Sequence, residues 1–448
     1  MTEATDDIEP ITLPDPGFVY VDTQEGLAEC VAALASSKVV GIDTESDSFF
    51  SYTERCCLVQ ITGEGTLDYI IDPLALDNLD ALAPLCADPS VVKIFHGADY
   101  DVVSMKRDFG HTFTNIFDTM IAAQATGHER FGLNDLVQRY FGEKLDKKWQ
   151  RHDWAQRPLL EAHLDYARKD SHFLPALREI LLEQAEPRGR LPMMEEEFAL
   201  LEQREWTGRP FSADDCMRVK GARGLDEIGR KVLRQVYVLR EGKAEAKNRP
   251  PFKVWGNDVL LRLADEAPED MEALRKCLGA NHHAIRRYGE ELLDAVLDGL
   301  DDESDPPPPA KARSTRNSDS PGLTRDDEPL VLKLKAWRNK KVKETDLGPG
   351  MIVNNTIIGR VAALKPTSVE QLVEIEDMRN WQRADFGEAL VGVVTKWLGE
   401  RPEPTDESGP KKKRRRRRRR RTPAGGEGSQ DAGGEGSATA EAASPTEE

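Results

Sequence analysis

The alternation of apolar and polar stretches in the first 190 residues predicts a domain that contains both strands and helices. Apolar runs typical of buried strands occupy positions 38–45, 57–62 and 67–72, and Gly63 and Gly65 separate the last two. Strands this close in sequence are expected to pair as consecutive hairpins. The pattern then alternates between helix and strand, at 76–86, 91–95, 100–109 and 113–117, and stays helical to about residue 186. These features predict an α/β fold, a mixed sheet with flanking helices.

The rest of the chain predicts two all-α domains separated by polar segments. Residues 301–329 are acidic and rich in proline and serine, which is typical of a linker. Residues 400–448 hold a basic run and then glycine, alanine, serine and glutamate, a composition that predicts a disordered tail. The expected order is a disordered lead-in, the α/β domain, a connecting segment, a helical domain, the linker, a second helical domain and the tail, at 1–15, 16–189, 190–215, 216–300, 301–329, 330–399 and 400–448.

The two helical regions resemble each other at a single spacing of 98 residues. This shift places Arg240 on Arg338 and Asn257 on Asn355 without a gap. The same shift relates further pairs: Lys243 and Lys341, Ala264 and Ala362, Pro268 and Pro366, Leu274 and Leu372, and Gly289 and Gly387. A match at one offset across both regions predicts a tandem duplication of one helical domain.

Length and composition indicate how many domains and which cellular compartment to expect. A chain of 448 residues has room for about three domains. No apolar run approaches the ~20 residues that a membrane span requires, and the polar, acidic N-terminus does not resemble a secretory signal. The six cysteines show no zinc-like spacing and indicate thiols in a reducing compartment. We therefore expect a cytoplasmic protein without a membrane partner.

Charge is segregated along the sequence. The net charge is −18, but Lys411–Arg421 is an unbroken run of eleven cations, so the rest of the chain carries −29 (−18 less those 11 positive charges). Such a run binds polyanions without sequence preference, or is simply a solvated tail or, in a nucleated cell, a localisation signal. An acidic body can still hold a polyphosphate where bound metal ions neutralise the point of contact.

Two acids interrupt the apolar run at 38–45. Asp43 and Glu45 stand two positions apart, so in a strand their side chains point to the same face of the sheet. Two neighbouring carboxylates on a largely buried element are unfavourable unless hydrogen bonds, a cation or a metal compensates them. This strand is therefore a candidate metal site.

Three further residues extend the candidate site. Asp101 falls in the first turn of a predicted helix, where an acid alone is most often a cap. Tyr166 and Asp170 share one face of a later helix, a common arrangement when taken alone. Together with the strand acids they supply four carboxylates and a phenol to one sheet. Two divalent cations would remove the repulsion, and all-oxygen ligation favours Mg²⁺ or Mn²⁺.

At these motifs the sequence resembles the ribonuclease D family, in the tyrosine-bearing branch of the DEDD exonuclease superfamily. Asp43-x-Glu45, the Asp101 segment and Tyr166-x-x-x-Asp170 resemble its three exonuclease motifs. The intervening text is also similar, at Phe117-Asp118-Thr119, Gly132-Leu133, Leu145-Asp146-Lys147, Asp153-Trp154 and Arg157-Pro158-Leu159. The helical repeats resemble the two HRDC domains that follow the nuclease in that family.

The resemblance implies a ribonuclease H-like fold and removal of nucleoside 5′-monophosphates from RNA 3′ ends. On that basis Asp43, Glu45, Asp101 and Asp170 hold two metal ions, and Tyr166 orients the attacking water. A phenol of pKa ~10 suits this positioning role, because it is poorly matched to abstract a proton at pH 7. The implied partners are RNA 3′ ends, with tRNA precursors or other stable RNA as substrates.

Several neighbours are weaker candidates for substrate contacts, and each has a structural alternative. His96 either contacts the terminal nucleotide or is a packed, hydrogen-bonded residue. Three aromatic residues in an apparent loop could stack on bases or anchor that loop: Phe49, Phe50 and Tyr52. Lys147 and Arg157 could reach phosphates, or belong to a solvated basic face. Asp118 is expected to cap the helix that begins near Thr119.

Two other functions fit part of the sequence. The site motifs do not separate RNA from DNA ends, so a 3′–5′ exonuclease acting on DNA is one alternative. A non-catalytic RNA-binding scaffold with a decayed nuclease fold is the other, and the intact set of acids argues against it.

Overall fold

The computed structural model describes residues 9–208, 210–308 and 322–400. The basic run Lys411–Arg421 and the expected tail from 401 lie outside these ranges, as do residues 1–8 of the lead-in and 309–321 of the linker.

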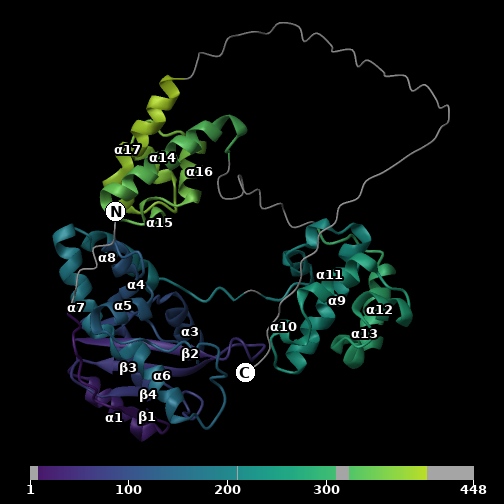
Figure 1. Ribbon diagram of the computed structural model, residues 1–448, viewed down its shortest axis with the longest axis horizontal. Coiled ribbons are helices and arrows are strands. Elements are labelled where there is room, and N and C mark those ends of the chain that lie inside the picture. The colour runs from purple at the N-terminus through teal and green to yellow at the C-terminus, as the bar shows by residue number, and fades with distance from the viewer. Residues whose placement is uncertain (1–8, 209, 309–321, 401–448) are drawn as a thin grey trace, which may run out of the picture. The chain divides into compact units, whose positions relative to one another are not determined.

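The α/β region is built on a six-stranded sheet. Its strands are β1 (Phe18–Val21), β2 (Val39–Ser46), β3 (Cys56–Gly63), β4 (Asp68–Ile71), β5 (Val92–Phe95) and β6 (Ile116–Asp118). They lie in the order β1-β4-β3-β2-β5-β6, and Figure 1 shows β2, β3 and β4 side by side. β2, β3 and β4 pair antiparallel, whereas the β1–β4, β2–β5 and β5–β6 pairs are parallel. The mixed sheet that the sequence predicts is confirmed.

Two expectations about this region are wrong. The strand expected at 38–45 is β2 and not the first one, because β1 and the helix α1 (Gln24–Leu34) precede it. β1 is a four-residue edge strand, too short for its polarity pattern to identify it. The helix expected at 76–86 is a 3₁₀ turn at Asp80–Leu82 followed by α2 (Ala83–Ala87). Proline is tolerated only in the first turn of a helix, so Pro84 fixes where α2 begins.

The remaining helices of the α/β region follow the predicted alternation. They are α3 (Asp99–Phe109), α4 (Thr119–Ala125), α5 (Leu133–Phe141), α6 (Glu161–His172) and α7 (Leu174–Ala185). A further helix, α8 (Leu191–Glu202), lies within the segment expected only to connect the domains.

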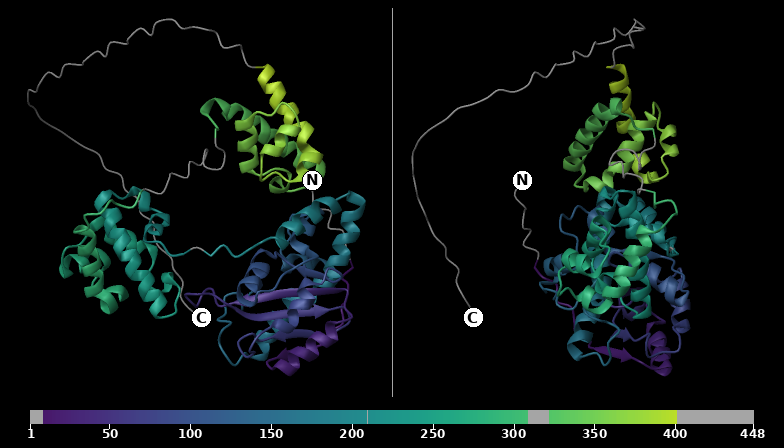
Figure 2. Two further views of the ribbon diagram at one scale, coloured as in Figure 1. Left: turned by 180° about the vertical axis from the view of Figure 1, so that it is seen from behind. Right: turned by 90° about the vertical axis from the view of Figure 1, so that its right-hand side faces the viewer.

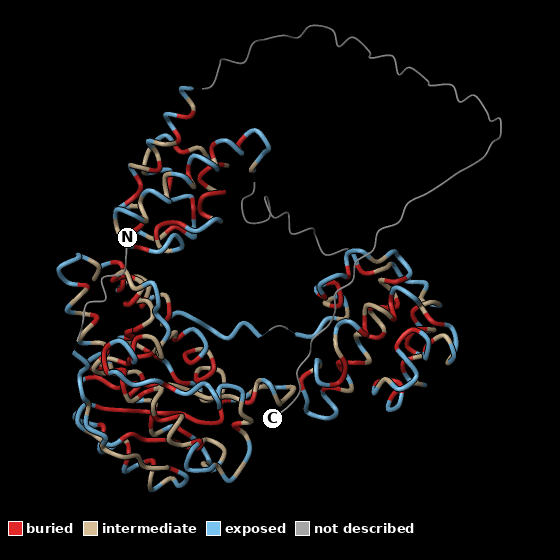
Figure 3. The backbone as a smooth tube through the Cα atoms, in the orientation of Figure 1, coloured by how far each residue is buried: buried red, intermediate tan, exposed pale blue. Residues whose placement is uncertain are grey.

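The two faces of β2 have different neighbours. Val40 and Ile42 are fully buried in an apolar cluster with residues of α1 and α3. The alternate residues, Gly41 among them, point to the opposite face, which α6 and α7 cover. A Cβ atom at Gly41 would lie 2.7 Å from the carbonyl oxygen of Ser171, so only glycine lets α6 approach this closely. Figure 1 shows α6 in front of the strands, Figure 2 shows the same sheet from behind, and Figure 3 shows that its strands are largely buried.

The two helical domains repeat one set of elements. The first contains α9 (Glu227–Ala246), α10 (Pro251–Val254), α11 (Asn257–Glu266), α12 (Met271–Leu278) and α13 (His283–Leu300). The second contains α14 (Glu328–Thr345), α15 (Pro349–Ile352), α16 (Asn355–Leu364) and α17 (Asn380–Gly399). The residues that end α11 and α16, Ala267 and Lys365, both adopt the left-handed conformation, with φ of 41° and 53°. The copies differ where the second has a 3₁₀ turn, Glu370–Glu374, in place of α12.

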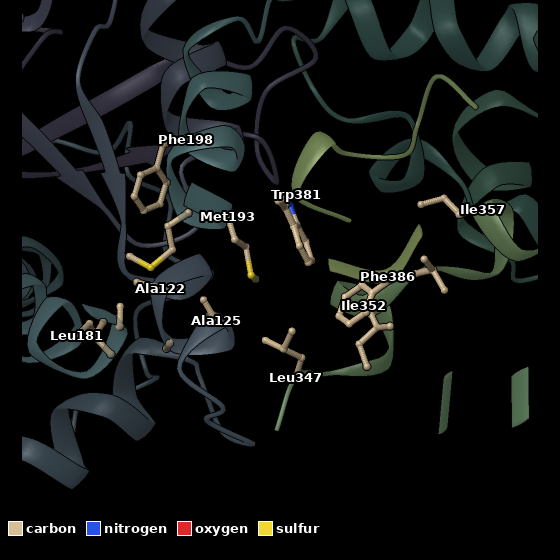
Figure 4. Close-up of a cluster of buried hydrophobic side chains, with 14 of the residues drawn as sticks. Ala122, Ala125, Leu181, Met193, Phe198, Leu347, Ile352, Ile357, Trp381 and Phe386 are labelled. Atoms are coloured by element: carbon tan, nitrogen blue, oxygen red, sulfur yellow. The ribbon is translucent and has the colours of Figure 1, made fainter. Parts of the chain in front are cut away.

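One apolar cluster includes side chains from α4, α7 and α8 and from the second helical domain. Figure 4 shows part of it, with Met193 of α8 and Trp381 of α17 next to each other. Glu196 strengthens this contact, because its carboxylate accepts hydrogen bonds from the backbone N–H groups of Asn380 and Trp381 at the start of α17. In the described ranges, no helix is both long enough and apolar enough to cross a membrane.

Candidate active site

The strand acids meet helix α6 at the face of β2 where Gly41 permits close approach. Asp43 and Glu45 from β2 and Asp170 from α6 each offer a carboxylate oxygen, and these oxygens all lie within 4.8 Å of one another. The three residues are half-buried. The sheet and the helix thus bring together acids that are about 125 positions apart in the sequence.

Tyr166 lies one helical turn before Asp170 on α6. Its ring stacks on that of the buried Trp154, with centroids 6.0 Å apart and planes inclined by 27°. Burial raises the pKa of the Tyr166 phenol, and the negative charges of Asp170, Glu45 and Asp43 raise it further. The phenol is therefore neutral near pH 7 and is held beside the acids.

Asp101 lies beside these acids and comes from a third element. It is the third residue of α3, which follows directly after β5, the parallel neighbour of β2. The hydroxyl of Thr44 donates a 2.6 Å hydrogen bond to Asp101 Oδ1. Asp101 is not within the group of three close carboxylates, but its charge acts on all of them.

The electrostatics of the four acids are unfavourable without a cation. Burial, and then the charge of Asp101, raise the pKa of Asp43 well above its usual range. Burial and the neighbouring acids do the same to Glu45. Burial raises the pKa of Asp101 to about 6, against the hydrogen bond from Thr44, and that of Asp170 to about 7. Among the described residues, no lysine or arginine forms an ion pair with any of the four.

A second observation supports a hydrated cation at this point. Gln60 of β3 lies directly opposite Asp43 and so points to the same face of the sheet. Its amide is fully buried, yet neither its oxygen nor its nitrogen has a hydrogen-bond partner in the described structure. Converging oxygens, repulsion between like charges and an unpartnered amide fit divalent metal ions better than a packed protein interior.

Comparisons with known proteins agree with this geometry. Residues 18–186 match the 3′–5′ exonuclease family, and residues 229–296 and 327–394 match the HRDC domain. The second HRDC match begins and ends 98 residues after the first, the spacing seen in the sequence. Ribonuclease D of Gluconacetobacter diazotrophicus is 31% identical over 85% of this chain and 93% of its own length.

The chain belongs to the ribonuclease D family. It is a 3′–5′ exoribonuclease with a nuclease domain followed by HRDC domains. Two solved structures are similar to it. The catalytic core of RRP6 from Trypanosoma brucei (C496S mutant) covers 65% of this chain and 83% of its own, at 30% identity and a TM-score of 0.59. Escherichia coli RNase D covers 85% and 99% at 22% identity and a TM-score of 0.62, a likeness in fold.

The weaker candidates lie in different surroundings. His96 is half-buried, and its Nδ1 lies 2.9 Å from the hydroxyl of Thr119. Phe49 is exposed, whereas Phe50 lies under the Lys253 ammonium, 3.6 Å from the ring centroid, and Tyr52 packs against the core of the first HRDC domain. Their contacts with substrate stay predictions.

The two basic candidates also differ. Lys147 is exposed. The guanidinium of Arg157 donates to both carboxylate oxygens of the buried Asp72, at 2.6 Å each, and to the carbonyl oxygen of Cys57. These hydrogen bonds tie the loop after Trp154 to the sheet, and a phosphate contact by Arg157 would have to compete with them.

One feature next to the site was missed from the sequence. A cavity of about 300 Å³ is lined by Tyr166 and Asp170, by three lysines and a tryptophan, and by two further acids: Lys144, Lys148, Lys169, Trp149, Asp146 and Asp165. Lys148 lies over the Trp149 ring, with its nitrogen 4.6 Å from the centroid. The run of lysines at 147–148 pointed to this loop, but only the fold turns Lys148 and Trp149 toward the acids.

Proposed function

We propose that this member of the family uses Asp43, Glu45, Asp101 and Asp170 to hold two divalent ions, Mg²⁺ or Mn²⁺, and trims the 3′ ends of tRNA precursors or other stable RNA. The observation that carries the assignment is the convergence of three carboxylates within 4.8 Å, with the charge of Asp101 acting on them and no cation paired to them in the described chain. Bound metal ions would supply charge neutralisation and the activation of water for in-line phosphodiester cleavage.

The chain's own residues divide the remaining work. The four carboxylates would hold the metal ions at a fixed place on the sheet, and they must be ionised to do so. The neutral Tyr166 phenol accepts or donates a hydrogen bond to the attacking water and so sets its direction of approach. The lysines beside Trp149 offer positive charge to the RNA backbone, and the indole offers a surface for a base.

RNA with a structured body is the preferred substrate class. The related Escherichia coli enzyme is described as an exoribonuclease involved in structured RNA processing, and this chain carries two HRDC matches after its nuclease domain. The first helix of the second HRDC match, α14, carries Lys335, Lys340, Lys341 and Lys343, which supports RNA contact there, whereas Arg338 of the same helix donates to the carbonyl oxygen of Val353 within the domain.

One experiment tests the proposal and its runner-up. The protein is incubated with a 3′-extended tRNA, single-stranded RNA and single-stranded DNA, each with Mg²⁺, Mn²⁺ or EDTA, and products are resolved to single nucleotides. We expect nucleoside 5′-monophosphates from both RNAs, a defined endpoint on the tRNA and no cleavage in EDTA. Faster shortening of DNA would favour the DNA-end alternative, and activity in EDTA would overturn the metal assignment.

A further inference from the structure

A single buried carboxylate joins the starts of two helices beside the candidate metal site. Asp118 ends β6 and is 1% exposed. Its Oδ1 accepts hydrogen bonds from the N–H groups of Met120 (2.8 Å) and Ile121 (3.0 Å) at the start of α4. Its Oδ2 accepts from Gly97 (3.0 Å) and Ala98 (2.7 Å) at the start of α3. The first pair is the cap expected from the sequence, and the second pair is not.

Helix α3 depends on this second pair. The first N–H groups of a helix have no partner within the helix and need an acceptor from elsewhere. The residue that precedes α3 is Ala98, whose side chain cannot accept a hydrogen bond. Asp118, twenty positions downstream, instead accepts from the N–H groups of Gly97 and Ala98 and so anchors the residues at which α3 begins.

Thr119, the residue after Asp118, also hydrogen-bonds to the turn before α3. The hydroxyl of Thr119 donates to the carbonyl oxygen of Phe95 (2.9 Å) and lies 2.9 Å from His96 Nδ1. Because the Thr119 hydroxyl donates its proton to Phe95, His96 Nδ1 is the donor in this second contact. Gly97, with φ of 81°, gives the turn its shape. Residues 95–98 are thus held to the β6–α4 junction by four hydrogen bonds.

These four hydrogen bonds, which we call the clamp, fix the position of Asp101. Asp101 is the third residue of α3, so the place where that helix begins sets the place of its carboxylate. We propose that Asp118 is a positioning residue of the nuclease, which holds the start of α3 so that Asp101 meets the carboxylates of β2 and α6. This inference rests on the proposed role of Asp101 as a metal ligand.

The test is direct metal binding by Asp118→Asn. An asparagine side chain has one acceptor oxygen, so it can serve α3 or α4 but not both, and its NH₂ group then faces two N–H donors. Mn²⁺ binding to the full-length protein is measured by isothermal titration calorimetry without RNA, and exonuclease rates are measured across a Mg²⁺ series. We expect Mn²⁺ affinity to fall by about 10–100-fold, as when residues behind metal ligands are changed. Excess Mg²⁺ should recover part of the rate.

A matched control separates positioning from ordinary helix capping. Thr23 caps α1 in the same domain, accepting from the N–H of Gly26, and α1 carries none of the proposed ligands. Thr23→Ala should lower the melting temperature while leaving Mn²⁺ affinity at the wild-type value. If Asp118→Asn also lowers only the melting temperature, Asp118 is a structural cap and the inference is wrong.

Two further variants keep the test decisive. Should Asp118→Asn fail to fold, Thr119→Val removes the second part of the clamp with little change in volume, and we expect a smaller loss of Mn²⁺ affinity in the same direction. Unchanged affinity in a folded Thr119→Val protein would then overturn the clamp. Asp101→Asn is the reference: if it binds Mn²⁺ normally, the proposed ligand set fails, whereas a loss in Asp101→Asn alone refutes only the role of Asp118.

Discussion

Helix α6 contributes to two groups of carboxylates, one paired with cationic side chains and one not. On one side, Arg168 donates to Asp15 (2.9 Å), to Asp165 (3.0 Å) and to the buried Asp68 (3.2 Å). His172, also on α6, lies 2.9 Å from Asp68. On the other side, Asp170 faces the two acids of β2, and no described cation pairs with them. One helix thus bears a neutralised acidic cluster and an uncompensated one.

The difference appears in the proton affinities of the acids. Hydrogen bonds from Arg168 lower the pKa of Asp15, whereas burial and Asp101 raise that of Asp170 to about 7. One arginine of α6, Arg168, is enough to pair with three acids, so a similar arginine could have paired with the acids around Asp170. Because no described cation pairs with the second cluster, we propose that the first cluster serves stability and that the second holds charge brought in from solution.

The largest expected effect is that of Asp170→Asn, which tests whether the uncompensated cluster is the catalytic one. Removing a ligand from the uncompensated cluster should lower the exonuclease rate by at least about 10³-fold, on the order of 4 kcal/mol of transition-state stabilisation. The metal-free protein should lose no stability, because the substitution relieves repulsion and burial of charge. Single-turnover rates on single-stranded RNA and urea unfolding in EDTA measure the two quantities.

Asp15→Asn is the matched control for that substitution. It removes an exposed acid from the neutralised cluster and leaves Arg168 its other two partners. We expect a rate within a few-fold of wild type and a small stability change, typical of an exposed ion pair. Near-normal turnover in Asp170→Asn would show that the uncompensated cluster is not the catalytic site.

The second prediction concerns the neutralised cluster. Arg168→Met leaves the fully buried Asp68 without its guanidinium partner, and breaking a buried pair in this way costs roughly 3–5 kcal/mol of unfolding free energy. The folded fraction should keep a rate within a few-fold of wild type. Lys169→Met provides the comparison for stability, since its 3.5 Å pair with Asp165 is partly exposed and worth at most about 1 kcal/mol. A large loss of turnover in folded Arg168→Met would mean that the two clusters are not separate.

The sequence allowed one of these clusters to be predicted and not the other. Acids inside an apolar strand and a Tyr-x-x-x-Asp pair on a helix are visible because they violate the local pattern. Arg168 and Asp68 violate nothing locally: a helix accepts an arginine, and Asp68 borders a turn. Their pairing depends on α6 crossing β4, which only the fold shows. The same holds for Asp118, whose bonds to its own helix were predictable and whose bonds to Gly97 and Ala98 were not.

The third prediction uses pH to sharpen the contrast. In EDTA the folded state keeps a proton on Asp170 up to a pKa of about 7, whereas the unfolded chain releases it near its ordinary value of 3.8. The folded state therefore binds more protons between these values, and this group's contribution to stability is lost as pH rises from about 4 to about 7. Mg²⁺ competes with those protons, so the rise in melting temperature on adding Mg²⁺ should be small at pH 5 and large at pH 8.

The control for this pH dependence is again on α6. Asp170→Asn should flatten the Mg²⁺-induced shift, while Asp15→Asn should leave it as in the wild type. The difference between pH 5 and pH 8 is expected to be on the order of 1–3 kcal/mol. A Mg²⁺-induced shift that does not change with pH would contradict ionisation of these acids on metal binding.

The smallest expected effect concerns the eleven consecutive cations of Lys411–Arg421, a run that contains no acid. Cations without acidic partners nearby should bind RNA phosphates. We therefore expect this run to add to RNA affinity without affecting catalysis at the metal site. Deleting residues 402–448 should weaken RNA binding at low salt and reduce the slope of log affinity against log salt, without changing the single-turnover rate at saturating RNA. Fluorescence anisotropy across a salt series measures the slope. Unchanged affinity at low salt would refute a binding role for the run, and an altered rate at saturation would show that its charge reaches the acids after all.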